Sequence, residues 1–299
     1  MAFDASKKGF CAAVLASLIW GGLAIYWRQL QAIPAYEILA YRMVSSFVVL
    51  LPVTVMCHSW KEIIPAFQNG RVLRRMVCST LLIALNWFGY IWAVNNGRIL
   101  ETSLGYYMSP LCNVALGCLF LRERISRLQM AAFAVALLGV MYAVICYGAF
   151  PWLGLWLAIS FALYGFIRKT VSIEALPGLF METMLLAPVA LSWILYQGLR
   201  GHGFLVSPSW REGLLLLGTG VVTALPLGLY AYGARRIRLI TMGFIQFLSP
   251  SGSFLIGVFL YKEPLTPAAL ITFSAIWLAL ILQMVDSWRV FRAAEARRG

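Results

Sequence analysis

Two ionisable residues that lie inside apolar segments are the strongest candidates for chemistry. Arg42 lies in AYEILAYRMVSS and Glu182 in LPGLFMETMLL, and the two positions are 140 residues apart. A charge inside an apolar span is costly, so such residues often line the route of a ligand or an ion. Each also has a structural explanation, because Arg42 can snorkel to lipid phosphate and Glu182 can hold two helices together by hydrogen bonding.

Glu182 is the carboxylate best suited to carry a proton. The other acidic residues lie at or beyond the ends of the apolar spans, or in loops. A carboxyl group within a helix can exchange a proton when the cavity beside it opens to one side of a membrane and then to the other. We therefore predict Glu182 as the coupling residue if transport uses protons.

The remaining candidates for ligand contact are aromatic, amide, hydroxyl and proline residues placed within the spans. Such a lining suits a compact, amphipathic organic solute. They are Trp20, Asn86, Tyr90, Tyr106, Ser109, Pro110, Asn113, Tyr164, Tyr230, Gln246, Ser249 and Pro250. The sequence has no metal-ligand cluster and no CxxC pair, so we predict neither a metal nor a cofactor.

A stretch of twenty residues that occurs twice positions several of these side chains. Residues 104–123 and 244–263 align at an offset of 140, so that Pro110 falls on Pro250. A proline within a helix lacks the amide that would complete the hydrogen bond, so we expect a kink and a free carbonyl at both places. The first copy carries small or polar residues at every fourth position, which serve either close helix packing or ligand contact. They are Gly105, Ser109, Asn113 and Gly117.

The composition is that of an integral membrane protein. Of 299 residues, 62% are hydrophobic and 12% are charged, with a mean hydropathy of +0.83. The net charge of +13 lies largely in short loops, which indicates membrane orientation and argues against nucleic-acid binding. We predict an all-α fold with ten spans, at roughly 9–27, 37–57, 76–95, 102–121, 128–147, 150–168, 178–198, 213–232, 239–261 and 267–285.

The charges of the loops predict the topology. Eighteen basic residues fall on the side of the N-terminus and five on the other, which places both termini in the cytoplasm. Five spans per copy then make 1–147 and 148–299 inverted repeats, with Arg42 near the outer face and Glu182 near the cytoplasmic face. We expect no ion pair between them, because about 15 Å of membrane depth separates them.

The stretch that begins NWFGYIWAVNNG at Asn86 carries a family resemblance. Together with Glu101, SLGYY from Ser103, and Pro110-Leu111, it resembles the RarD group of the EamA-type proteins, in the drug/metabolite transporter superfamily. The repeated Glu-(Arg/Pro)-(Ile/Leu)-(Ser/Thr) that follows an apolar helix is similar to the EamA unit. The resemblance implies ten helices, a bacterial inner membrane and a permease role, but no settled substrate.

We therefore predict a secondary-active transporter that exports small metabolites or drugs by alternating access, with the proton as candidate coupling ion. Its partners would be a small-molecule substrate and membrane lipids. A membrane enzyme is the main alternative, but the chain has no nucleophile motif and no large loop domain. A channel or a structural membrane protein is a further alternative, although a channel would need a more continuous polar stripe.

Overall fold

The computed structural model describes residues 2–96, 98–203, 209–262 and 264–296. These residues form helices joined by short turns, without any strand. Glu263, which the sequence repeat pairs with Glu123, lies outside the described residues. The helices are α1 (Ala2–Arg28), α2 (Ala35–Met56), α3 (Trp60–Gln68), α4 (Gly70–Asn95), α5 (Ile99–Leu119), α6 (Arg127–Tyr147), α7 (Trp152–Thr170), α8 (Ala175–Leu199), α9 (Trp210–Arg236), α10 (Leu239–Gln246), α11 (Leu248–Leu255), the π-helix η1 (Ile256–Leu260) and α12 (Pro267–Ala296).

Eight segments among the described residues are long and apolar enough to cross a membrane. They are α1, α2, α4, α6, α8, α9, the combined segment from α10 to η1, and α12. The predicted spans 102–121 and 150–168 coincide with α5 and α7, which do not meet this test. Polar side chains explain the shortfall, because α5 carries Glu101 and Asn113 and α7 ends in Arg168-Lys169.

The two proline-containing helices differ. In the second copy, α10 ends at Gln246, the residue whose carbonyl Pro250 cannot bond, and a new helix begins after Phe247. In the first copy, α5 continues as a helix through Pro110. The predicted ninth span is therefore interrupted, whereas the fourth is a single helix.

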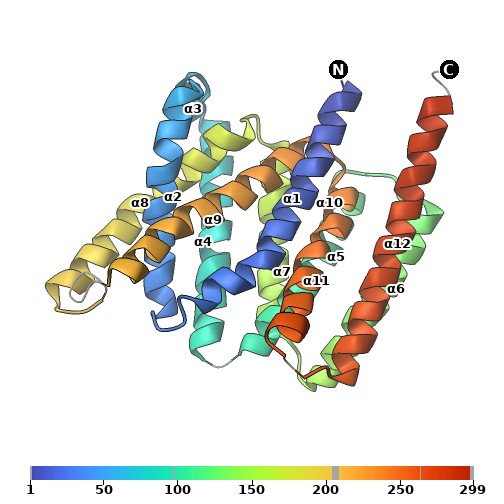
Figure 1. Cartoon of the computed structure of the whole chain (residues 1–299). Coiled ribbons are helices and arrows are strands. Elements are labelled where there is room, and N and C mark those ends of the chain that lie inside the picture. The colour runs from blue at the N-terminus through green and yellow to red at the C-terminus, as the bar shows by residue number, and fades with distance from the viewer. Residues whose placement is uncertain (1, 97, 204–208, 263, 297–299) are drawn as a thin grey trace.

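The two ends of the bundle are distinguished by the chain termini. The first turn of α1 and the last turn of α12 lie at the same end, together with α3 (Figure 1). We call this the terminal end and the opposite one the far end. Chain order then places the start of α2 at the far end and the start of α8 at the terminal end.

Helices from the two halves of the chain pack against each other throughout the bundle. α1 contacts α9 and α11, α5 contacts α7 and α10, α4 contacts α7, and α2 contacts α8 and α9. α12 and α6 form a pair at one edge of the molecule (Figure 1). Glycines permit two of the closest approaches: a Cβ atom on Gly105 would lie 2.9 Å from the Gly154 carbonyl, and one on Gly21 would lie 3.1 Å from the Gly252 Cα atom.

Candidate functional site

The first site surrounds Arg42, the eighth residue of α2. Its Nε atom donates a hydrogen bond to the Thr223 hydroxyl on α9 (3.0 Å). The guanidinium carbon lies 4.9 Å from the ring centre of Trp27 on α1 and 4.8 Å from that of Trp87 on α4. These distances are in the range of cation–π attraction, so the two indole rings stabilise the charge. The lipid-snorkelling alternative for Arg42 does not fit these contacts, because the guanidinium points among helices.

Two tyrosines complete this site. The ring centres of Tyr90 on α4 and Tyr106 on α5 are 6.3 Å apart, and both phenols lie within electrostatic range of the Arg42 guanidinium. Tyr106 is 53% exposed, and Arg42 and Tyr90 are partly exposed. These side chains come from five helices and, with the exception of Thr223, keep part of their surface exposed. We call this group the Arg42 cluster: Trp27, Arg42, Trp87, Tyr90, Tyr106 and Thr223.

The second site surrounds Glu182, the eighth residue of α8, and is closed. Glu182 is only 2% exposed. One carboxylate oxygen accepts a hydrogen bond from the Ser79 hydroxyl on α4, and the other accepts one from the Tyr164 hydroxyl on α7 (3.1 Å). The Nε atom of Arg168 lies 3.7 Å from Oε1. Glu182 therefore has two hydrogen-bond donors and a counter-charge inside the protein.

Arg168 is a site residue that the sequence prediction missed. Arg168 lies in the last turn of α7 and is 0% exposed. Its Nη2 atom donates to the Ala175 carbonyl (2.7 Å). Gly178 on α8 makes room for the guanidinium, since a Cβ atom there would lie 1.9 Å from Nη1. A buried guanidinium beside a buried carboxylate is expected only as a pair.

Aromatic rings extend the Glu182 site into the bundle. The Tyr164 and Tyr230 rings are 6.3 Å apart and nearly parallel, at 15°. Trp20 lies 5.6 Å from Tyr230, and Phe161 lies 5.1 Å from the same ring. Both tyrosines are fully buried. We call Ser79, Arg168, Glu182 and these four rings the Glu182 cluster; it brings together Trp20, Tyr164, Tyr230 and Glu182, which the sequence analysis singled out separately.

Three predicted amide residues serve contacts between helices. Asn113 on α5 and Gln246 on α10 form a hydrogen bond through their side chains, and the Asn113 amide lies beside the Tyr230 hydroxyl. The Asn86 amide donates to the Leu157 carbonyl (2.8 Å), so it joins α4 to α7. Asn113 and Gln246 thus border the Glu182 cluster, and Asn86 belongs to neither cluster.

The predicted serine–proline pairs lie at helix contacts. Ser109, Pro110 and Pro250 are buried and Ser249 is partly exposed. A Cβ atom on Gly243 would lie 2.6 Å from the Pro110 carbonyl, so α10 crosses α5 at this point. One on Gly21 would lie 3.0 Å from the Ser249 carbonyl. The small-residue stripe therefore supports close packing in this conformation.

A small cavity lies between the two clusters. Trp87 and Thr223 line it on the side of the Arg42 cluster, and Glu182 and Thr183 line it on the other. The cavity has room for about one water molecule. Arg42 does not pair with Glu182, whose counter-charge is Arg168. Among the described residues, no three His, Cys, Asp or Glu side chains gather as a metal site would require.

Ion pairs between helices gather at the terminal end. Glu123 accepts hydrogen bonds from the backbone amides of Leu239 (2.8 Å) and Ile240 (3.0 Å) at the start of α10, and Lys169 Nζ lies 3.9 Å from it. An anion at a helix N-terminus satisfies amides that have no helical acceptor. These contacts join the ends of α5 and α7 to the start of α10.

Glu174 forms a second group of ion pairs at the same end. It lies 3.1 Å from Arg236 and 3.5 Å from Arg235 at the end of α9. Burial alone would raise the pKa of Glu174, but the charges of Arg235 and Arg236 and the hydrogen bonds outweigh it and hold the pKa below its usual value. At the far end, by contrast, the Arg98–Glu101 pair (3.1 Å) joins residues of one helix turn.

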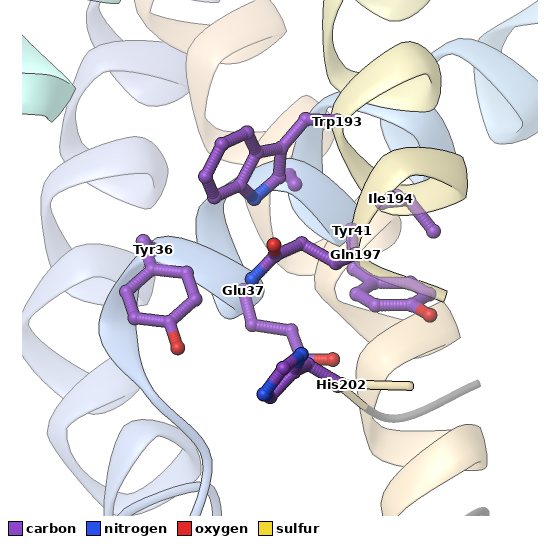
Figure 2. Close-up of a pocket in the computed structure, with 9 residues that line it drawn as sticks. Tyr36, Glu37, Tyr41, Trp193, Ile194, Gln197 and His202 are labelled. Carbon is purple, nitrogen blue, oxygen red and sulfur yellow. The ribbon is translucent and has the colours of Figure 1, made fainter. Parts of the chain in front are cut away.

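A pocket lies between the far-end parts of α2 and α8, which otherwise pack against each other. Figure 2 shows the Glu37 side chain reaching from α2 toward His202, with Tyr36 and Trp193 on the same side of the pocket. The rings of Tyr36 and Trp193 meet edge to face at 6.3 Å. This pocket also has room for about one water molecule. It does not share residues with the Arg42 cluster.

Comparison with known proteins identifies the family. The model of the EamA-like transporter family matches residues 7–145. The uncharacterized transporter YojE of Bacillus subtilis is 42% identical, over 97% of this chain and 98% of the relative. Protein RarD of Escherichia coli is 36% identical over 94% and 95%. The chloramphenicol-sensitive protein RarD of Pseudomonas aeruginosa is 31% identical over 98% and 99%.

These relatives cover nearly the whole chain, which belongs to the EamA-like transporter family. Together with the eight membrane-length segments, this makes it a multi-pass membrane protein. One solved crystal structure, 18% identical, superposes with a TM-score of 0.72 and covers 94% of this chain and 98% of its own. The chain therefore shares that fold.

Proposed function

We propose that the protein is a secondary-active transporter that exports small organic metabolites or drugs across a bacterial inner membrane by alternating access. The named transporters among its relatives support this class over a membrane enzyme or a structural protein. The observation that carries the mechanism is the difference between the two clusters. The Arg42 cluster keeps exposed surface and lies nearer the far end, whereas the Glu182 cluster is buried on the side of the terminal-end ion pairs.

An inverted repeat, with halves at 1–147 and 148–299 and ten spans, would give a transporter two exchangeable gates. Two observations support it. Arg122 and Lys262, which are equivalent in the two copies, both have a positive φ (52° and 56°). The helix contacts also match when the halves are exchanged: α1 with α9 corresponds to α7 with α4, and α5 with α7 corresponds to α11 with α1.

The orientation follows from the loop charges. The eighteen-to-five excess of basic residues favours a cytoplasmic terminal end, with both chain termini inside the cell. In that orientation the conformation is open outward at the Arg42 cluster and closed inward at the Glu182 cluster. Transport would then require the terminal-end ion pairs to separate and the far-end opening to close.

Alternating access can be tested by cysteine accessibility in a background without the six native cysteines. Tyr106→Cys should react with a membrane-impermeant maleimide in right-side-out vesicles, whereas Tyr230→Cys should stay protected. A transported solute added at saturation should change the reactivity of both positions. Equal and unchanging reactivity of the two cysteines would exclude the proposed cycle. Counterflow in proteoliposomes then establishes which solutes move.

We further propose Glu182 as the proton carrier. Protonation would cancel its charge and weaken its attraction to Arg168, which is 3.7 Å away, so that proton binding would favour opening of the Glu182 cluster. Glu182→Gln keeps the shape but cannot titrate. This variant should exchange solute in counterflow and lose uphill transport driven by a pH gradient. Undiminished pH-driven transport would remove Glu182 from the mechanism.

A further inference from the structure

We propose that the Arg42 cluster binds the carboxylate of a small aromatic organic acid, which makes organic anions the substrate class; this rests on the proposed transport function. The charge balance of the site is the first argument. The hydrogen-bond acceptor of Arg42 among the described residues is the Thr223 hydroxyl, which is neutral, and its other neighbours are aromatic rings. A cation at this depth without a carboxylate partner is best stabilised by an anionic ligand.

Other cations in the bundle contrast with Arg42. Arg168 has Glu182, Lys169 has Glu123, and Arg236 has Glu174, at distances from 3.1 to 3.9 Å. Arg42 differs from these three, because its guanidinium lies among helices against two indole rings and has no carboxylate within ion-pair distance in the described chain. The residue as a whole is partly exposed. Its charge is therefore available to a ligand, and a cationic solute would be repelled.

The geometry of the cluster favours a carboxylate that carries an aromatic ring. The Nε atom of Arg42 is bonded to Thr223, so the two terminal amino groups of the guanidinium remain as donors. These two amino groups form a planar fork whose geometry matches the two oxygens of a carboxylate. The neighbouring Tyr90 and Tyr106 rings offer aromatic surface beside this fork, and Tyr106 is 53% exposed. A ring attached one or two bonds from the carboxylate would reach these faces and stack on them.

The purified full-length protein in detergent can be titrated by calorimetry with phenylacetate, phenylacetamide and phenethylamine. These probes share one ring and differ in charge. Phenylacetate should bind about tenfold more tightly than phenylacetamide or better, because only the former makes a charge-assisted pair. Arg42→Gln should abolish this preference. Arg42→Lys, which keeps the charge and loses the fork, should retain a weaker one.

Arg211→Gln is the matched control. It removes a positive charge at the same end of the molecule, from an exposed side chain that bonds Gln29, and should leave the preference unchanged. Equal affinity for phenylacetate and phenylacetamide, no measurable binding of phenylacetate, or a preference that survives in Arg42→Gln would each overturn the inference.

Counterflow separates this inference from the proposed function. Counterflow of a neutral or cationic solute, together with equal affinity for the acid and its amide, would keep the transporter and reject the substrate class. Arg42-dependent binding of phenylacetate without counterflow of any bound acid would keep the binding site and reject transport.

Discussion

Arg42 and Glu182 occupy equivalent positions in the two halves of the chain, yet the surroundings of their charges differ. Each is the eighth residue of its helix, near opposite ends of the bundle. Arg42 has a neutral hydroxyl and two aromatic faces around it and stays partly exposed. Glu182 has a buried arginine and two hydroxyl donors around it and is almost completely buried. The Glu182 charge is thus paired with an arginine within the protein, whereas the Arg42 charge has no carboxylate partner among the described residues.

Among the described residues, ion pairs such as Lys169–Glu123 and Arg236–Glu174 join helices at the terminal end. At the far end, helices are joined by hydrogen bonds, such as those that Glu101 accepts from the Tyr147 hydroxyl and the Leu153 amide.

In the Glu182 cluster, charged and hydroxyl groups bond one another, so opening this cluster would expose them to water. In the Arg42 cluster, the guanidinium bonds a neutral hydroxyl and lies against aromatic rings. If the Arg42 cluster closes when the Glu182 cluster opens, the free energy of closing the Arg42 cluster should depend on a bound ligand. The free energy of closing the Glu182 cluster should depend on Arg168.

The largest effect is expected from breaking the closed side. Arg168→Ala leaves Glu182 buried without its counter-charge, which should cost about 3–5 kcal/mol of unfolding free energy. Thermal unfolding of the purified protein measures this loss. The double variant with Glu182→Ala should recover part of it, because neither charge is then left alone. If Arg168→Ala unfolds at the wild-type temperature, the pair does not stabilise the closed cluster.

Crowding the same cluster should have a smaller effect. Gly178→Ala puts a methyl group where the Arg168 guanidinium lies and should cost about 1–3 kcal/mol. Gly22→Ala is the matched control, since a Cβ atom there meets nothing within 4 Å and alanine favours a helix. Unfolding midpoints of the two variants check this difference. Equal midpoints would show that Arg168 adapts without loss.

The open side should contribute little to stability. Arg42→Ala loses one hydrogen bond to a neutral group and two cation–π contacts that remain partly hydrated, about 1 kcal/mol in all. The same thermal scans used for Arg168→Ala measure it. A loss as large as that of Arg168→Ala would mean that the Arg42 cluster is a structural element like its counterpart.

The smallest effect concerns pH and the ion pairs above the closed cluster. Because the pKa of Glu174 is lowered in the folded protein, its contribution is present above the unfolded pKa and is lost as the pH falls through the folded value. Glu174→Gln should therefore lower the free energy of unfolding slightly at pH 7, by at most about 1 kcal/mol, and this difference should disappear as the pH falls below the lowered pKa of Glu174 in the folded protein. Glu212→Gln at the far end, which leaves the ion pairs of Glu174 intact, is the control variant for the same scans.

Much of the architecture was predictable from hydropathy alone. Nine of the predicted spans each coincide with one helix, and the span 239–261 coincides with α10, α11 and η1 together. Eight of the ten segments are long and apolar enough to cross a membrane. The other two, α5 and α7, fall short because Glu101, Asn113 and Arg168 make them more polar, and these are residues that the fold buries. The short helix α3 was not predicted, since its nine residues lack the length of a span.

The division of the candidate residues into two clusters could not be predicted. It depends on contacts between halves, such as Arg42 with Thr223 and Asn113 with Gln246, which lie 181 and 133 residues apart. Arg168 was missed because a basic residue at the end of an apolar run resembles a loop charge. Its burial is set by Gly178 and Glu182, on the helix that follows.

The interruption of the membrane segment at Phe247 has a mechanical consequence. Its first piece, α10, is anchored by Glu123, which holds the amides of Leu239 and Ile240. Its second piece, α11, packs against α1, and Ser253 donates a hydrogen bond to the Gly21 carbonyl there (3.2 Å). Because Pro250 cannot bond the Gln246 carbonyl, the helical hydrogen-bond pattern has a gap at that carbonyl, and it resumes where the Ser251 amide bonds the Phe247 carbonyl (3.2 Å). We therefore expect this membrane segment to bend more readily at the gap than within α10 or α11.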